Sequence, residues 1–113
     1  GVEDGMKIAR EEIFGPVISA LPFDTLDEVV ARANATPYGL AAGIFTRDLS
    51  TAHRMVKRIK AGSVWVNDIH RSNHSAPFGG MKQSGVGREK GRYGVESYLE
   101  YKTVYLTYDE GLA

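Results

Sequence analysis

The alternation of apolar and polar positions predicts three strands and two helices in the first two-thirds of the chain. Apolar runs of strand length occur at residues 17–23, 40–46 and 63–67. Between the first two runs, apolar residues recur at intervals of three and four, as they do on one face of a helix: Leu26, Val29, Val30 and Ala33. Thr25 and Glu28 have the spacing of a capping box, which predicts where this helix begins.

A second helical pattern fills the interval between the second and third apolar runs. We expect this helix to begin at about Asp48 or Ser50 and to end before Gly62, which stands where a left-handed cap belongs. The positions expected to point inward are Leu49, Ala52, Val56 and Ile59.

Strand, helix, strand, helix and strand in this order, with short connections, predict a parallel βαβαβ sheet. The strands read as continuous apolar runs, which is typical of parallel strands covered on both faces. The predicted fold class is therefore α/β.

The last third of the chain is organised differently. Residues 68–84 show no periodicity, and a loop of this length is more often functional than a passive connection. A short helix is expected near 89–97, followed by a long strand that begins at Leu99 and ends at Tyr108. Both faces of this strand carry apolar side chains, which favours pairing with another chain. We therefore divide the chain into a body (1–98), a terminal strand (99–108) and a tail (109–113).

Composition excludes several classes of protein. The 113 residues contain 14 basic and 14 acidic side chains, so charge gives no reason to expect nucleic acid or a membrane surface as a partner. There is no cysteine, which excludes a disulfide scaffold or a cysteine-based zinc site. The first residues have no signal-peptide pattern, and a cytoplasmic location is expected. Because the sequence does not begin with methionine, we expect the natural chain to start upstream.

Three motifs that suggest phosphate, dinucleotide or metal binding do not hold on inspection. Val86 stands where a phosphate-binding loop needs lysine, and Lys90 stands where a dinucleotide fingerprint needs its third glycine. His70 and His74 have no third ligand nearby, so no metal site is predicted.

Glu12 and Phe14 form the more informative pair. In an extended segment, residues two apart point to the same side, so this carboxylate and this ring would face one ligand together. A carboxylate can accept hydrogen bonds from both hydroxyls of a ribose, and a ring can lie against a flat cofactor. The alternative is an exposed acidic pair followed by a buried phenylalanine, and composition alone does not decide between the two.

Six ordered blocks resemble the C-terminal part of the aldehyde dehydrogenase family. The blocks are EEIFGPV (11–17), YGLAAGIFT (38–46), GSVWVN (62–67), PFGGMKQSG (77–85), GRE (87–89) and EYKTV (100–104). The resemblance implies the fold of that part of the catalytic domain, with residues 99–108 as an oligomerisation strand. It also implies NAD or NADP as the cofactor.

The resemblance also implies roles for individual residues. Glu12 would hold the nicotinamide ribose and Phe14 would pack near the nicotinamide. Phe78 would contact the aldehyde, as would Asn67, Arg71 and Ser72 around the loop. Glu89 would relay a proton, and Arg88 and Glu100 would hold the interface by charge pairing.

The implied reaction is oxidation of an aldehyde to a carboxylic acid with NAD(P)+ through a cysteine thioester. The nucleophilic cysteine and the general-base glutamate are not in these residues, so we expect the segment to be inactive alone and the full-length parent to be the enzyme. The small aldehyde substrate and a homo-oligomer, dimer or tetramer, are the expected partners. Two alternatives remain: a non-catalytic module that pairs with a full-length homologue, or part of a semialdehyde dehydrogenase that acylates coenzyme A.

Overall fold

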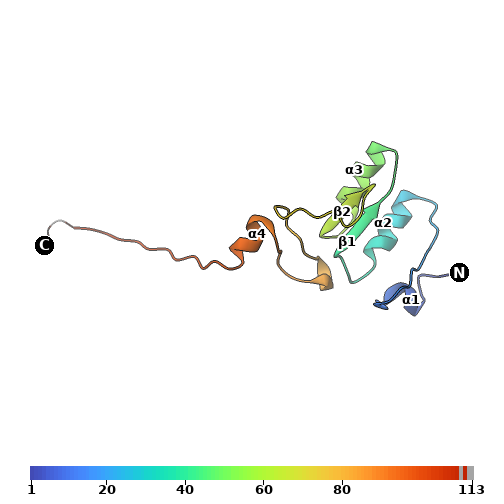
Figure 1. Cartoon of the computed structure of the whole chain (residues 1–113), viewed down its shortest axis with the longest axis horizontal. Coiled ribbons are helices and arrows are strands. Elements are labelled where there is room, and N and C mark those ends of the chain that lie inside the picture. The colour runs from blue at the N-terminus through green and yellow to red at the C-terminus, as the bar shows by residue number, and fades with distance from the viewer. Residues whose placement is uncertain (110, 112–113) are drawn as a thin grey trace.

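A parallel pair of strands and two helices form the centre of the computed structural model, which describes residues 1–109 and 111 (Figure 1). Helix α2 (Leu26–Asn34) precedes strand β1 (Ala41–Ile44), and helix α3 (Leu49–Arg58) connects β1 to strand β2 (Ser63–Val66). The two strands pair in parallel register, from Ala41 with Ser63 to Ile44 with Val66. The predicted α/β class is confirmed.

Both central helices begin where their capping residues predict. The hydroxyl of Thr25 accepts a hydrogen bond from the Glu28 N–H at 3.2 Å, and the Glu28 carboxylate accepts one from the Asp24 N–H at 2.9 Å. Asp48 caps α3 by accepting bonds from the backbone N–H groups of Ser50 and Thr51. A hydrogen bond from the Thr51 hydroxyl lowers the pKa of Asp48 below its ordinary value.

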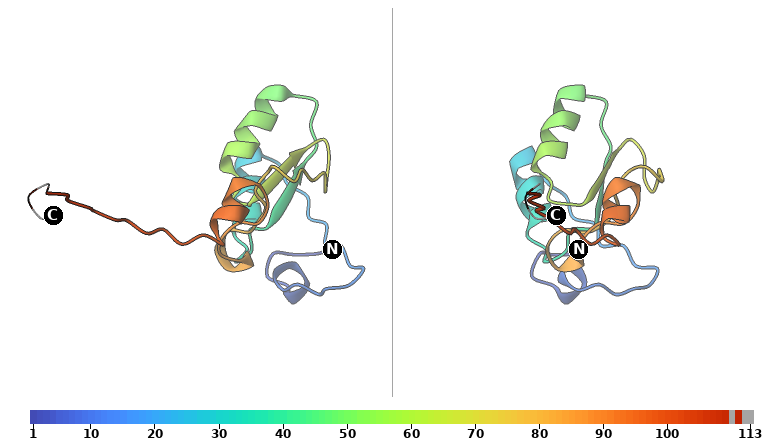
Figure 2. Two further views of the ribbon diagram at one scale, coloured as in Figure 1. Left: turned by 60° about the vertical axis from the view of Figure 1, so that its left-hand side comes forward. Right: turned by 90° about the vertical axis from the view of Figure 1, so that its left-hand side faces the viewer.

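The hydrophobic core lies between one face of the strand pair and the two helices. Val30 of α2, Met55 of α3 and Ile44 of β1 are buried together, and Val64 of β2 packs against them. The views in Figure 2 place α2 and α3 on the same side of the strands. Of the inward positions predicted for helix α3, Ala52 is buried and Ile59 packs against the core, whereas Leu49 is 72% exposed and Val56 40% exposed. Met55, the second buried residue of this helix, was missed.

The opposite face of the strands is covered by the loop that follows β2. Because side chains alternate along a strand, Val64 points to the core while Trp65 points to the other side. The Trp65 indole N–H donates to the carbonyl of Arg71 at 2.8 Å, so the loop folds back over this face. One face of β2 therefore packs against the core, and the other face contacts the loop.

A backbone junction, which we call the glycine junction, joins the strands to the glycine-rich segment 79–85. The carbonyl of Gly39 accepts hydrogen bonds from both Gly62 N–H at 3.0 Å and Met81 N–H at 2.8 Å. A Cβ on Gly62 would lie 1.6 Å from the carbonyl oxygen of Gly79. Gly62 is thus required for close approach, not as the predicted left-handed helix cap. The last residue of helix α3 is Arg58, and its C-cap is Ile59, whose backbone is extended.

Two predicted strands have no hydrogen-bonded partner within the described chain. Residues 17–23 form no ladder because no third strand lies beside β1 and β2, and Ile18 is 93% exposed. Residues 99–108 run away from the body as an extended segment without strand pairing (Figure 1). Within this chain the predicted three-stranded sheet is therefore two-stranded. Of the tail, residues 110, 112 and 113 lie outside the described part.

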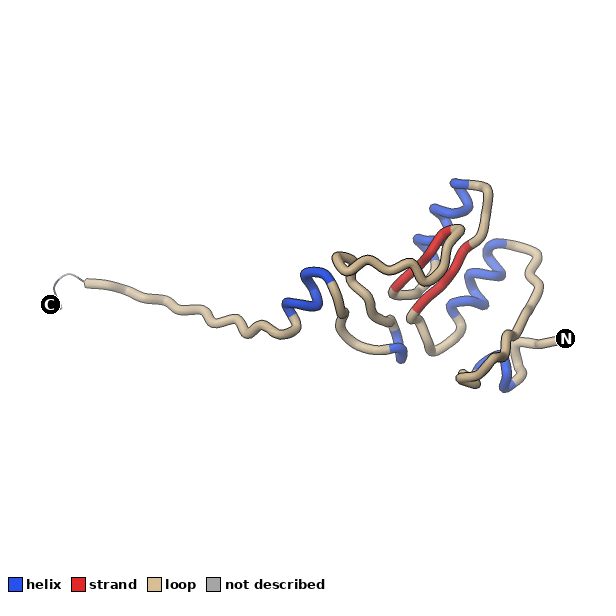
Figure 3. The backbone as a smooth tube through the Cα atoms, in the orientation of Figure 1, coloured by secondary structure: helices blue, strands red, loops and turns tan. Residues whose placement is uncertain are grey.

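Short helical elements complete the chain, and Figure 3 shows how much of the remainder is loop. They are α1 (Lys7–Arg10), the 3-10 turn η1 (Lys82–Ser84) and α4 (Gly91–Glu96). The radius of gyration is 21.5 Å, well above the ~13 Å typical of a compact domain of this length. Among the helices of the described residues, none has the length and apolarity that a bilayer crossing requires.

Replacing Gly62 by alanine should destabilise the protein by roughly 2 kcal/mol or more, because the new methyl group has to displace the Gly79 backbone. The measurement is the midpoint of urea unfolding. Gly5→Ala is the matched control, since no atom lies within 4 Å of a Cβ at Gly5. Equal midpoints for the two variants would contradict the close packing of the glycine junction.

Candidate functional site

Glu12 and Phe14 line one open pocket near the N-terminus, which we call the N-terminal pocket. Its volume is about 580 Å³. Phe14 has φ of 54°, in the left-handed region that bulky residues seldom adopt, and its side chain is 94% exposed. The predicted alternative of a buried phenylalanine is therefore wrong. The complete lining consists of Ile8, Glu11, Glu12, Ile13, Phe14, Gly15, Val17 and Ser19.

The backbone after Phe14 turns sharply and is tied to α1. The N–H of Val17 donates to the carbonyl of Gly15 at 2.7 Å, across Pro16. The hydroxyl of Ser19 donates to the carbonyl of Ile8 at 3.0 Å. These contacts present the Phe14 ring on the outside of the turn, and Glu12 stands beside it in the same pocket.

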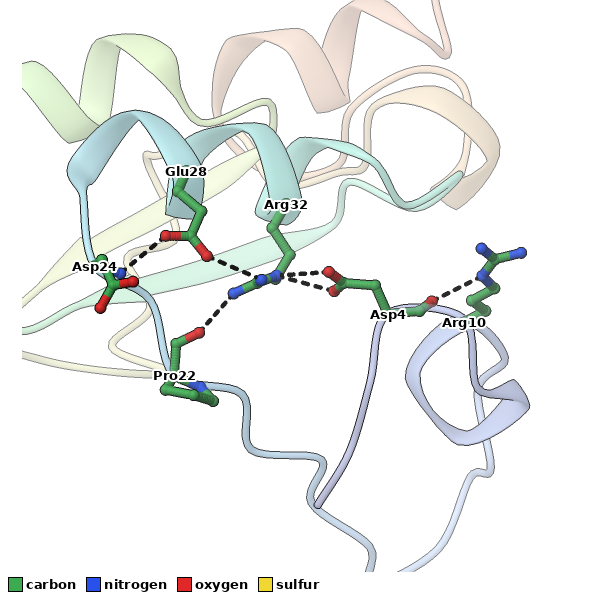
Figure 4. A network of polar contacts seen from close by, with 6 residues as sticks. All are labelled: Asp4, Arg10, Pro22, Asp24, Glu28 and Arg32. Carbon is green, nitrogen blue, oxygen red and sulfur yellow. Dashed lines mark hydrogen bonds and ion pairs between the residues drawn. The ribbon is translucent and has the colours of Figure 1, made fainter.

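Arg32 on α2 connects this N-terminal region to the core (Figure 4). Its guanidinium forms an ion pair with Asp4 at 2.9 Å, donates to the carbonyl of Pro22 at 2.7 Å and bonds Glu28 at 3.0 Å. The hydrogen bond from the Asp24 N–H lowers the pKa of Glu28, and the charge of Arg32 acts in the same direction. Two separate segments of the N-terminal region, one at Asp4 and one at Pro22, thus meet at one side chain of α2.

Phe78, Arg71 and Ser72 line a second pocket of about 450 Å³, which we call the loop pocket. It is built on the Trp65 side of β2, opposite the hydrophobic core. The other residues of its lining are Gly62, Ser63, Val64, Trp65, His70, Asn73, Ala76, Pro77 and Lys90. The structure therefore brings together three of the four residues predicted to contact substrate.

Trp65 and His70 hold the wall of the loop pocket. Their rings stack with centroids 5.8 Å apart and planes 3° from parallel. The indole N–H of Trp65 also bonds the Arg71 carbonyl, so the loop is fixed at two consecutive residues. His70 has φ of 61°, a backbone conformation that the stacked ring and the hydrogen bond hold in place.

Lys90 joins the loop to Phe78. Its ammonium lies 5.4 Å from the centroid of the Phe78 ring, within the range of a cation–π contact. It also donates a hydrogen bond to the Ser72 hydroxyl at 2.7 Å. Two predicted substrate residues are therefore held by a lysine that the sequence analysis did not assign to the site.

Asn67, the fourth predicted substrate residue, lies outside the loop-pocket lining. Its side-chain amide donates to the carbonyl of Thr46 and accepts from the N–H of Thr46, both at 2.9 Å. These two bonds join the exit of β1 to the exit of β2. The contact of Asn67 with a substrate remains a prediction.

Glu89 is placed by an antiparallel bridge with Phe78. The two residues exchange backbone hydrogen bonds of 2.8 and 2.7 Å. The Arg88 guanidinium donates to the carbonyls of Gly80 and Gly87 at 2.8 and 2.6 Å, and so fastens the same segment to the glycine junction. Glu100 lies on the exposed terminal segment, and no Arg88–Glu100 ion pair is present in residues 1–109 and 111.

Residues 1–109 and 111 hold no cluster of three or more His, Asp or Glu side chains that could bind a metal. The N-terminal pocket does have groups that fit a dinucleotide. A free carboxylate can accept bonds from a ribose diol, and an exposed ring in a fixed backbone conformation can lie against a flat heterocycle.

Sequence reasoning missed Trp65 and Lys90 as site residues. Strand alternation could have indicated Trp65, since Val64 and Trp65 point to opposite faces of β2. No pattern indicates Lys90, because its place beside Phe78 results from the bridge between segments eleven residues apart.

Comparison with known proteins gives consistent matches over nearly the whole chain. The sequence profile of the aldehyde dehydrogenase family matches residues 1–104. A betaine aldehyde dehydrogenase of Cereibacter sphaeroides is 57% identical over 105 residues, which cover 93% of this chain and 22% of that protein. A betaine aldehyde dehydrogenase of Rhizobium leguminosarum is also 57% identical over 105 residues, with the same coverage.

Solved structures agree with the sequence relatives. The NAD+ complex of an aldehyde dehydrogenase from Bacillus cereus superposes with a TM-score of 0.91 at 51% identity. That match covers 96% of this chain and 22% of the solved chain. This chain therefore spans about a fifth of the length of the proteins it resembles.

Trp65→Phe keeps an aromatic ring against His70 but removes the hydrogen bond to the Arg71 carbonyl. The substitution should therefore loosen the loop pocket. We expect amide hydrogen exchange in the loop after β2 to become at least about fivefold faster, as for the loss of one ~1 kcal/mol hydrogen bond. Tyr93→Phe is the control, since Tyr93 lies on α4 and outside this lining. Unchanged amide exchange rates in Trp65→Phe would contradict the proposal that this hydrogen bond restrains the loop.

Proposed function

This chain belongs to the aldehyde dehydrogenase family, and we propose that it is the C-terminal segment of an enzyme that oxidises an aldehyde to a carboxylic acid with NAD+ or NADP+. The observation that carries the proposal is the N-terminal pocket, where Glu12 stands beside a Phe14 ring exposed by a left-handed backbone. The Cereibacter sphaeroides relative is 57% identical over 93% of this chain, and a Bacillus cereus relative was solved with NAD+.

In the proposed enzyme, Glu12 and Phe14 position the cofactor. When bound, the nicotinamide accepts the hydride that the aldehyde loses. The Glu12 carboxylate accepts hydrogen bonds from the ribose hydroxyls, and the Phe14 ring limits where the flat nicotinamide can lie. Such positioning affects rate strongly, since a misplacement of ~1 Å can cost on the order of 100-fold.

The loop pocket supplies part of the surface that receives the aldehyde. Phe78 gives an apolar contact, and Arg71 and Ser72 give polar contacts within the same lining. The stack of Trp65 on His70 holds this wall before substrate arrives, which lowers the entropy lost on binding. Asn67 acts from the base of the loop, where its amide bonds to Thr46 set the direction in which the loop departs.

Glu89 is proposed as a proton carrier next to the substrate surface. Its backbone is fixed to Phe78, and its exposed carboxylate can exchange protons with water. Arg88 is proposed to pair with Glu100 once residues 99–108 dock against another subunit, because this segment pairs with no strand among residues 1–109 and 111. An oligomer formed through this strand and a cytoplasmic location complete the proposal.

Glu12→Gln should slow NADH formation by the complete enzyme by about tenfold, because an amide accepts ribose hydrogen bonds more weakly than a carboxylate. The measurement is kcat with saturating aldehyde, together with the dissociation constant of NAD+. Glu3→Gln is the control, since it removes the same charge from an exposed residue outside the lining of the N-terminal pocket. Equal rates for Glu12→Gln and the unmodified enzyme would remove this assignment, as would equal losses in the two variants.

Replacing Thr103 and Val104 together by proline should lower the oligomeric state. Successive N–H groups of a strand point to opposite sides, so the pair removes one donor from whichever edge is bonded to the partner. Light scattering on a dilution series should give a dissociation constant raised by tenfold or more. The control exchanges the same positions as Thr103→Val with Val104→Thr and keeps both N–H groups. An unchanged molar mass in the double proline variant would exclude this strand as the interface.

A further inference from the structure

We propose that the loop pocket selects aldehydes whose far end carries a carboxylate, and that Lys90 is the residue that sets this preference. The inference rests on the proposed function, since it names the substrate class of that same site. It follows from the charges of the pocket, from the contacts of Lys90 and from the hydroxyl beside it.

The charges that line the loop pocket have one sign. Its lining includes the cationic side chains of Arg71 and Lys90 and contains no aspartate or glutamate. Glu89 is adjacent to Lys90 in sequence but lies outside this lining. A pocket with this balance concentrates anions and repels cations, and low-dielectric walls such as Trp65 and Phe78 strengthen the effect.

The two cations of the loop pocket are not equally available. Arg71 forms an ion pair with Asp68, with Nε and Oδ2 3.5 Å apart, and its side chain is 84% exposed. Solvent and Asp68 both weaken its field. Lys90 is half-buried, and no carboxylate among residues 1–109 and 111 lies within ion-pair distance of its ammonium. Lys90 is therefore the cation whose charge is least compensated.

The contacts of Lys90 leave it able to bind a further anion. An ammonium has three N–H donors, and one of them is used by the Ser72 hydroxyl. The Phe78 ring interacts with the charge without accepting a conventional hydrogen bond. Because Ser72 accepts from Lys90, its own O–H remains able to donate. A carboxylate in the pocket can thus receive one bond from Lys90 and one from Ser72.

The Phe78 ring lies beside Lys90, whose ammonium is 5.4 Å from the ring centroid, so the ring would contact the carbon chain of an aldehyde whose carboxylate is bonded to Lys90. A carboxylate bonded to Lys90 would then lie at the opposite end of that carbon chain from the reacting carbonyl. A trimethylammonium group in the same place would be repelled by the Lys90 ammonium, and the lining contains no carboxylate to pair with it.

The test uses three aldehydes with the same four-carbon chain and different terminal charge: 4-oxobutanoate, butanal and 4-(trimethylammonio)butanal. We expect the complete enzyme to give the highest kcat/KM with 4-oxobutanoate. Lys90→Met should lower the ratio of kcat/KM for 4-oxobutanoate to that for butanal by about tenfold, the effect of losing one bond between charged groups. The ratio for the cationic aldehyde to butanal should rise.

Two controls separate charge from general damage. Lys90→Arg keeps the cation and should retain most of the preference, whereas Lys57→Met removes a lysine from the exposed surface of α3 and should leave all ratios unchanged. An unchanged order of the three aldehydes in Lys90→Met would overturn the inference, and so would a loss equal for all three.

A binding measurement distinguishes failure of this inference from failure of the proposed function. Calorimetric titration compares butanoate with butanamide, which have the same carbon chain and differ in the charge of the terminal group. If no aldehyde yields NADH, the proposed function fails. Binding of a carboxylate at Lys90 is supported in that case if butanoate binds more tightly than butanamide and Lys90→Met removes the difference. Equal affinities for the two compounds would overturn the inference.

Discussion

The rest of the structure depends on the hydrogen bonds that converge on the carbonyl of Gly39. By accepting from Gly62 and Met81 at once, this oxygen joins the start of β1, the start of β2 and the glycine-rich segment. Such convergence requires three backbones to approach closely, and a side chain at Gly62 would occupy the space of the Gly79 carbonyl. The segment fixed there leads directly to Phe78, which is bridged to Glu89. The geometry of the loop pocket therefore depends on a backbone contact made by Gly62, a residue of its own lining.

Strand β2 separates stability from binding by the alternation of its side chains. Val64 adds to the core with Val30, Ile44 and Met55, while Trp65 faces the loop and holds it. Because the two groups lie on opposite faces, the loop pocket can carry polar and charged residues without placing them in the core. One face of the strand pair is covered by the helices and the other by the loop.

The large exposed apolar surface is consistent with a segment that packs against further structure of its family. Only five hydrophobic residues are buried in the described part of the chain, whereas Ile18, Tyr105 and Leu106 are each more than four-fifths exposed. Isolated protein domains seldom leave so much apolar surface to water. The N-terminal region is held to α2 mainly by Arg32, a partly exposed group whose ion pairs contribute little in water. Apolar covering from the remainder of a homologous catalytic domain would supply what these polar contacts lack.

The sequence by itself determined the elements whose causes are local. Thr25 and Asp48 fixed the starts of α2 and α3, the apolar runs fixed β1 and β2, and the spacing of Glu12 and Phe14 indicated one shared pocket. Only the tertiary structure decided matters that depend on distant neighbours. Residues 17–23 formed no strand because a ladder needs an adjacent strand, α3 turned Met55 inward to fit Val30, and Lys90 reached Phe78 and Ser72 through a bridge between two loops. Local sequence patterns predict caps and hydrogen bonds between residues a few positions apart. Pockets are made by contacts between segments that are far apart in the sequence, which local patterns do not indicate.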